Sequence, residues 1–183
     1  FCVKTAGIPG KELDNILQNL KMNDKIHKQI KSLQDQLDME KESKIIEEVQ
    51  VQIKKQFEGE GTGHDWWHMV RVVNNALTIG RAENANLFLI ELSAWLHDIG
   101  DHKFHKETDA QERLITQILD DVGLKKEIQK EILAIVASVS YKGAKVETLP
   151  SSLEGQVVQD ADRLDAIGAI GIARAFAFGG NKE

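Results

Sequence analysis

Cysteine is almost absent from this sequence, and long apolar runs are lacking altogether. Cys2 is the only cysteine, which excludes an intrachain disulfide framework and is in keeping with a reducing compartment. No apolar run approaches the roughly 20 residues that cross a bilayer, and the segment from Phe1 to Gly10 lacks the apolar stretch of a signal peptide. We therefore expect a soluble, cytoplasmic protein without a membrane partner. Because the chain does not begin with Met, we also expect its natural start to lie further upstream.

A surplus of positive charge is also lacking. The chain has 23 Lys and Arg residues against 29 Asp and Glu residues, a formal net charge of −6. Binding to a nucleic acid polymer requires basic side chains that neutralise phosphates, so we expect no such partner. Hydrophobic residues make up 42% and charged residues 28% of the 183 residues. This composition is typical of one folded domain with a packed core, with room for a small appendage.

Prolines are confined to Pro9 and Pro150, and between them apolar residues recur at helical spacing. No segment keeps the alternation of a β-strand, so we predict an all-α protein. It would consist of an N-terminal helical hairpin over residues 1–40 and a helical bundle over residues 41–183. The bundle helices are expected to begin after Met39 and at Asp65, a candidate N-cap, and to continue over residues 87–99, 109–122, 125–138 and 153–176.

The hairpin is predicted from two short amphipathic segments. The first ends near Leu20, and Asn23 or Asp24 can cap the second. Within the second segment, apolar residues follow the spacing of a helix that packs on a partner helix, at Ile26, Ile30, Leu33 and Leu37. Two interpretations stay open: this stripe covers an apolar face of the bundle, or it joins two chains in a homodimer.

Ionisable residues gather in two apolar segments. His97 and Asp98 end the most apolar helix that we expect, and the last expected helix contains Asp160, Asp162 and Asp165 among apolar neighbours. Burial of such groups is costly unless a partner compensates the charge. A shared divalent cation would satisfy both segments, because imidazole and carboxylate are good ligands for such ions.

A third segment supplies further imidazoles. His68 lies one helical turn after His64, so the two can share a helix face. A set of His68, His97, Asp98 and Asp162 would offer nitrogen and oxygen ligands from three separate helices and leave positions open for water and substrate. A closed structural zinc site is not expected, because such sites are rich in cysteine.

Three segments together resemble the HD superfamily of metal-dependent phosphohydrolases, in particular its small bacterial single-domain branch. They are HDWWHMVRV at residues 64–72, HDIGD at 97–101 and DADRLDAIG at 160–168, and the resemblance covers residues 42–180. It implies an HD-domain helical bundle with one divalent ion (Mn, Ni, Co, Fe, Mg or Zn). The implied metal ligands are His68, His97, Asp98 and Asp162. Members of this branch continue with further helices after the position of Phe178 to Gly180, whereas this sequence stops at Glu183. Two interpretations stay open: a C-terminal segment is absent, or the N-terminal hairpin fills the vacated face.

Further roles are expected around the ion. Asp101, His64 or His105 would manage protons. Four basic residues near the motifs could hold phosphate oxygens or be ordinary surface charges, namely Arg71, Lys103, Lys142 and Arg163.

Two further pairs of residues complete the candidate site residues. Asp160 and Asp165 are expected to orient the site or to cap a helix rather than to bind the metal. Trp66 and Trp67 could stack on a nucleobase or belong to the core.

The resemblance implies a phosphohydrolase that acts on nucleotides or other small phosphorylated metabolites by metal-activated water. Cleavage of a phosphomonoester and release of pyrophosphate from a nucleoside triphosphate both stay open. Two alternatives remain. A dinuclear HD-type enzyme would need extra ligands, for which His64, Asp101 and His105 are the candidates. A non-catalytic nucleotide sensor or interaction module would bind without turnover.

Overall fold

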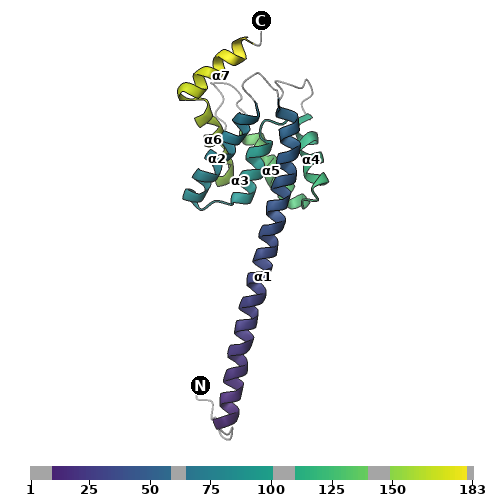
Figure 1. The fold of residues 1–183 in the computed structure, drawn as a ribbon, viewed down its shortest axis with the longest axis vertical. Coiled ribbons are helices and arrows are strands. Elements are labelled where there is room, and N and C mark those ends of the chain that lie inside the picture. Colours follow the sequence, from purple (N-terminus) through teal and green to yellow (C-terminus); the bar gives the residue numbers. More distant parts are fainter. Residues whose placement is uncertain (1–9, 59–64, 101–109, 140–148, 181–183) are drawn as a thin grey trace. The chain divides into compact units, whose positions relative to one another are not determined.

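The computed structural model describes residues 10–58, 65–100, 110–139 and 149–180. These residues form seven helices and no strand, which confirms the all-α prediction (Figure 1). The helices are α1 (Gly10–Phe57), α2 (Trp66–Glu83), α3 (Leu87–Leu96), α4 (Ala110–Asp121), α5 (Lys126–Val139), α6 (Leu153–Asp165) and α7 (Gly168–Gly180). None of these helices combines the length and the apolar character that crossing a bilayer demands.

The hairpin predicted over residues 1–40 is wrong, because residues 10–57 form the single helix α1. A hairpin needs a break in the helical hydrogen bonds, and the sequence from Lys11 to Glu58 contains neither glycine nor proline. Asn23 and Asp24 are helix interior residues instead of caps. Contacts divide the chain into two units, residues 1–43 and residues 44–183. That residues 1–40 and 41–183 are separate domains stays a prediction.

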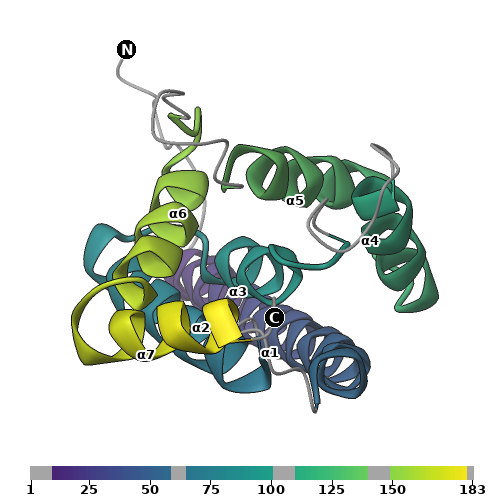
Figure 2. The same ribbon diagram turned by 90° about the horizontal axis from the view of Figure 1, so that it is seen from above.

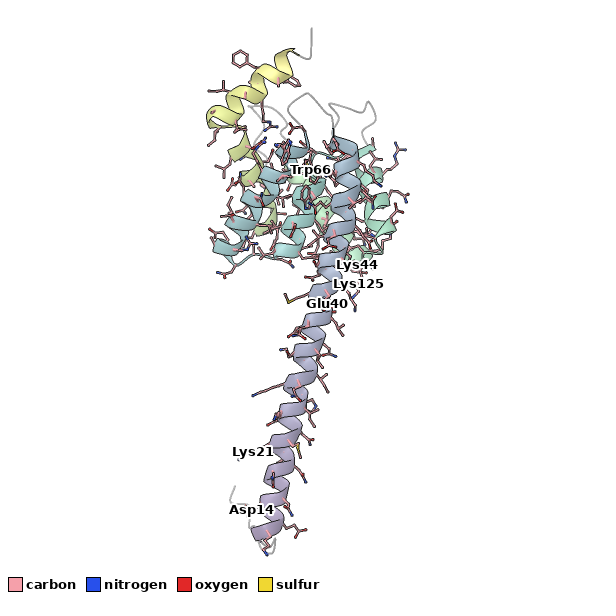
Figure 3. The ribbon with its side chains drawn as sticks, viewed as in Figure 1. Asp14, Lys21, Glu40, Lys44, Trp66 and Lys125 are labelled. Carbon is pink, nitrogen blue, oxygen red and sulfur yellow. The ribbon has the colours of Figure 1, made fainter. Side chains whose placement is uncertain are left out.

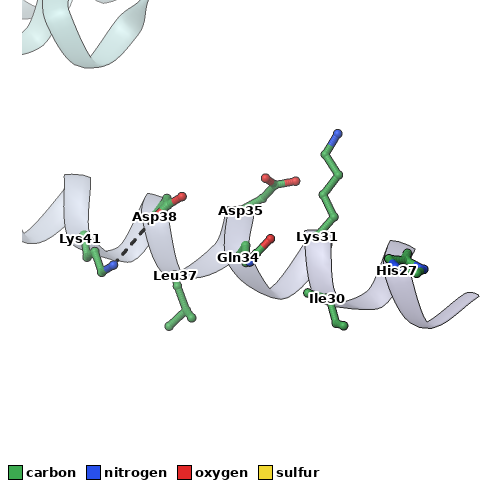
Figure 4. A pocket seen from close by; sticks show the side chains of 8 residues that line it. All are labelled: His27, Ile30, Lys31, Gln34, Asp35, Leu37, Asp38 and Lys41. Carbon is green, nitrogen blue, oxygen red and sulfur yellow. Dashed lines mark ion pairs between the residues drawn. The ribbon is translucent and has the colours of Figure 1, made fainter. Parts of the chain in front are cut away.

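The apolar stripe of α1 is exposed. Ile26, Ile30, Leu33 and Leu37 keep between 46% and 59% of their accessible surface. Figure 4 shows Ile30 and Leu37 on one side of the helix and Lys31 on the other, with Asp38 paired to Lys41 at 3.8 Å. An exposed ion pair of this kind contributes little stability. Both roles considered for the stripe, the homodimer included, stay predictions.

Between residues 44 and 180, the described residues form a helical bundle in which α3 is central. Helix α2 packs against α3 and α6, and α3 also packs against α5 and α6 (Figure 2). The sequence of α3, LFLIELSAWL, has Glu91 as its one charged residue, and seven of its ten residues are buried. Asn86 caps its N-terminus by accepting a hydrogen bond from the Leu89 backbone N at 3.2 Å. The predicted central buried helix is confirmed, although it ends at Leu96 instead of Ile99.

The single last helix predicted over residues 153–176 is in fact two helices, α6 and α7. At the end of α6, the backbone N of Ala166 donates to the Arg163 carbonyl oxygen and that of Ile167 to the Leu164 carbonyl oxygen. These tighter bonds end the helix, and Gly168 then takes a left-handed backbone with φ 67°. Apolar residues continue through the break, so the periodicity did not reveal it.

Gly123, between α4 and α5, also has a left-handed backbone, with φ 68°. An added Cβ would meet no atom within 4 Å, so alanine there introduces backbone strain without a clash. We expect Gly123→Ala to lower the free energy of unfolding by about 1–2 kcal/mol in urea titrations. Gly179→Ala has equally open surroundings and no positive φ, and is expected to have no such cost. Equal values for the two variants would contradict this interpretation.

Candidate metal centre

Three helices bring the predicted ligands together. His68 lies in the first turn of α2, where the Asp65 carboxylate accepts a hydrogen bond from the His68 backbone N at 2.8 Å, which confirms the predicted cap. His97 and Asp98 follow the last residue of α3, and Asp162 lies on α6. Because α2 and α3 both pack against α6, side chains from all three helices can meet.

The functional atoms of these four residues converge. One ligand atom each of His68, His97 and Asp98 lies within 4.8 Å of the others. His68 Nε2 lies 3.2 Å from Asp98 Oδ2 and 3.5 Å from Asp162 Oδ1. His97 Nε2 lies 3.6 Å from each of the same two oxygens. Two imidazole nitrogens therefore face two carboxylate oxygens.

The spacing of these atoms fits a divalent cation. Ligands bound at about 2.1 Å are separated by about 3.0 Å when they are neighbours in an octahedron, and by about 3.4 Å in a tetrahedron. The observed separations of 3.2–3.6 Å are close to these values. Imidazole and carboxylate are also a donor set that first-row divalent ions accept. The cluster could therefore hold a metal ion.

Three of the four residues in the cluster are buried. His68, His97 and Asp98 retain 0%, 3% and 7% of their accessible surface, whereas the Asp162 side chain retains 28%. Asp162 therefore marks the side of the cluster that faces solvent. Charged and polar groups buried to this degree are costly unless they compensate one another or share a cation.

The pKa of His97 reflects this environment. Burial lowers it, but the Asp98 and Asp162 carboxylates and the Ala94 carbonyl outweigh the burial and raise the pKa to about 9. For the Asp162 carboxyl, burial acts in the opposite direction and raises the pKa. The contact with His97 outweighs the burial, so the pKa of Asp162 lies below its ordinary value. In the metal-free protein, a proton on His97 thus compensates the two carboxylates, and a bound cation would compete with that proton.

The other ring nitrogen of each histidine has its own acceptor. His97 Nδ1 lies 2.7 Å from the Ala94 carbonyl oxygen, and His68 Nδ1 lies 2.7 Å from Asp165 Oδ2. Asp165 is buried, whereas Asp160 is exposed on the same helix. Each of these two carboxylates was expected either to orient the site or to cap a helix, and the contact with His68 supports the first role for Asp165.

Asp165 is itself surrounded by cations. Burial raises the pKa of its carboxyl, but the hydrogen bonds from His68 and Arg71 and the positive charge of Arg71 outweigh the burial, so this pKa lies far below its ordinary range. Arg174 Nη1 adds a third donor at 3.0 Å. Arg174 was not among the predicted site residues, because its place on α7 depends on a helix break that the sequence pattern did not reveal.

Two of the predicted phosphate-binding residues can be placed. Arg71 donates from Nε and Nη2 to the two oxygens of Asp165, at 2.6 and 2.9 Å. It lies beside the cluster, but its guanidinium is already engaged by a carboxylate. Arg163 is exposed on α6, and its neighbour in sequence, Asp162, belongs to the cluster. That either residue binds phosphate stays a prediction.

Five predicted site residues lie outside the described residues. They are the proton-transfer candidates His64, Asp101 and His105 and the phosphate-binding candidates Lys103 and Lys142. Their assignments stay predictions.

The two tryptophans at the start of α2 differ. Trp66 stacks on Trp95 with ring centroids 5.1 Å apart and planes 15° apart, and Lys54 Nζ lies 5.8 Å from its centroid. Trp66, labelled in Figure 3, is therefore a packing residue of the bundle. Trp67 is 63% exposed and precedes His68, so it stays a candidate for stacking on a nucleobase.

A largely buried cluster of two histidines and two aspartates, brought together by three helices of an all-α bundle, is the arrangement that the HD motif implies. Residues 66–167, more than half of the chain, match the family model of the HD domain. The chain belongs to the HD domain family.

Individual proteins are also similar to this chain. YpgQ of Bacillus subtilis is 40% identical over 146 residues, which cover 78% of this chain and 70% of YpgQ. A crystal structure of YpgQ in complex with ADP is 39% identical, with a TM-score of 0.61, and the match covers 78% of this chain and 69% of that chain.

Two further crystal structures extend the comparison. One, of a Lactobacillus plantarum protein, is 35% identical with a TM-score of 0.67, over 75% of this chain and 64% of that chain. The other, of an HD-superfamily hydrolase from Bacillus thuringiensis, is 38% identical with a TM-score of 0.62, over 77% and 68%. The chain thus spans between 64% and 70% of the length of these relatives.

Proposed function

We propose that this protein is an HD-type metal-dependent phosphohydrolase that acts on nucleotides or other small phosphorylated metabolites. The observation that carries the proposal is the separation of 3.2–3.6 Å between two imidazole nitrogens and two carboxylate oxygens in a largely buried cluster. The similarity of this chain to an HD-superfamily hydrolase of Bacillus thuringiensis supports a hydrolytic activity.

The residues His68, His97, Asp98 and Asp162 would hold one divalent cation. When bound, such a cation activates water for attack on phosphorus and polarises the phosphoryl oxygen. Asp165 keeps the His68 ring oriented through Nδ1, and the Ala94 carbonyl does the same for His97. The partly exposed Asp162 leaves the solvent side of the cluster accessible to a substrate.

A nucleotide is the substrate class that we favour. The related YpgQ was crystallised with ADP, and the exposed Trp67 beside His68 offers a ring on which a base could stack. Arg71, Arg163, Lys103 and Lys142 are the proposed phosphate-binding residues, with Asp101, His64 or His105 as the groups that manage protons. The products formed from a panel of nucleotides would distinguish cleavage of a monoester bond from cleavage of an anhydride bond.

Metal removal tests the proposal. Protein stripped with a chelator is expected to release no phosphate or pyrophosphate from a panel of nucleoside mono-, di- and triphosphates, because the cluster then lacks its electrophile. Addition of Mn²⁺, Co²⁺ or Ni²⁺ is expected to restore turnover of at least one substrate. Phosphate release, pyrophosphate release and the nucleotide products would be measured separately.

The same experiment separates the alternatives. Two ions per chain in metal analysis of the active protein would indicate the dinuclear relative. Nucleotide binding without turnover under every metal would indicate the sensor. Turnover that persists at the full rate after chelation would contradict the metal-dependent proposal.

A further inference from the structure

Asp165 contacts the candidate metal centre through the Nδ1 side of the His68 ring. It is the last residue of α6 and lies one helical turn after Asp162. The residue is 5% exposed, and its Oδ2 lies 2.7 Å from His68 Nδ1. Because the opposite nitrogen of the same ring faces Asp98 and Asp162, Asp165 acts on the cluster through His68.

Two arginines fix the orientation of this carboxylate. Arg71 on α2 donates to both oxygens, from Nε at 2.6 Å and from Nη2 at 2.9 Å. Arg174 on α7 donates from Nη1 to Oδ2 at 3.0 Å and to the Asp165 carbonyl oxygen at 3.4 Å. A bidentate guanidinium fixes the plane of a carboxylate more tightly than a single donor does. Donors from two helices, α2 and α7, therefore hold Asp165 in one orientation.

This contact determines which nitrogen of His68 is presented to a cation. An ionised carboxylate only accepts hydrogen bonds, so the ring proton belongs on Nδ1 and the Nε2 lone pair faces the cluster. His97 is supported differently, since its Nδ1 contacts the neutral carbonyl oxygen of Ala94. A carboxylate partner also makes a ligating imidazole more basic, which strengthens its bond to a metal.

We propose that Asp165, clamped by Arg71 and Arg174, is the positioning residue that presents His68 Nε2 to the divalent cation. The inference rests on the proposed function, because it requires that the cluster binds a cation. It assigns a metal-supporting role to Arg71 and to Arg174. Helix α7 buries no residue of its own, and Arg174 connects this helix to the candidate metal centre.

The test is the affinity of the metal-free protein for Mn²⁺, measured by calorimetry in wild type and Asp165→Asn. The amide keeps the size of the side chain but removes its charge. We expect the dissociation constant to rise by about 10–100-fold. Asp160→Asn makes the same charge change on the same helix at an exposed position, and is expected to leave the dissociation constant within about twofold of wild type.

A second variant keeps the test decisive if Asp165→Asn does not fold. Arg174→Gln removes one donor from Asp165 and leaves the Asp165–His68 contact in place, and is expected to weaken Mn²⁺ binding in the same direction by a smaller factor. Circular dichroism of each metal-free variant monitors folding. If Asp165→Asn does not fold, Arg174→Gln decides, and unchanged Mn²⁺ binding in that variant overturns the inference.

The outcomes separate the two proposals. Wild-type protein that binds no Mn²⁺, Co²⁺ or Ni²⁺ overturns the proposed function itself. Wild type and Asp165→Asn that bind Mn²⁺ equally well overturn the positioning role and leave the proposed function standing. Lower thermal stability of Asp165→Asn with an unchanged Mn²⁺ dissociation constant means a structural role alone, and this also overturns the inference.

Discussion

Asp98→Ala is expected to reduce metal-dependent turnover by more than about 100-fold, because loss of a ligand should exceed the 10–100-fold cost of losing a supporting residue. The Asp98 carboxylate oxygen lies 3.2 Å from His68 Nε2 and 3.6 Å from His97 Nε2. Its removal leaves the two buried imidazoles with Asp162 as the remaining carboxylate of the set. Turnover would be measured on the best substrate of the nucleotide panel, at saturating Mn²⁺ and at several lower concentrations.

The matched control is Asp121→Ala, which removes an exposed carboxylate on α4 and is expected to retain wild-type turnover. His97→Ala is expected to lose activity as Asp98→Ala does, since both remove a ligand from the same centre. Full metal-dependent turnover in both His97→Ala and Asp98→Ala would show that the reaction takes place elsewhere.

The stability of the metal-free protein is expected to fall as the pH rises from about 6.5 to about 9. His97 titrates near 6.5 when unfolded and at about 9 when folded, so the folded state holds the proton more tightly. Its contribution to stability is fully present below pH 6.5 and is lost as the pH passes the folded value. At 1.36 kcal/mol for each unit of pKa, the loss is about 3 kcal/mol.

Urea unfolding at pH 6, 7.5 and 9 in the presence of a chelator would measure this loss. Saturating Mn²⁺ is expected to remove most of the pH dependence, because a cation then takes the place of the proton between Asp98 and Asp162. His97→Gln is expected to flatten the profile even without metal. A metal-free wild type with equal stability at pH 6 and pH 9 would contradict the protonated state of His97.

Much of the fold was predictable from local pattern. Helix α3 is recognisable from its near-continuous apolar residues, and the N-cap at Asp65 depends on residues within one turn of the start of α2. That His68, His97 and Asp98 gather into a cluster that could hold a metal ion was also predictable, because an ordered series of short motifs pointed to it. The hairpin was not, because Asn23 and Asp24 are compatible with both a cap and a helix interior, and the uninterrupted helical hydrogen bonds decide between them.

The sequence by itself determined the donor groups of the candidate metal centre: which side chains are able to bind a cation, and that each lies within a helix or next to the end of one. Tertiary structure alone decided how those groups are supported. The hydrogen bond from His68 to Asp165 joins residues 97 positions apart, and Arg174 reaches the same carboxylate after the chain reverses at Gly168. Contacts of this kind depend on how helices pack against one another, and no periodicity within a single segment encodes them.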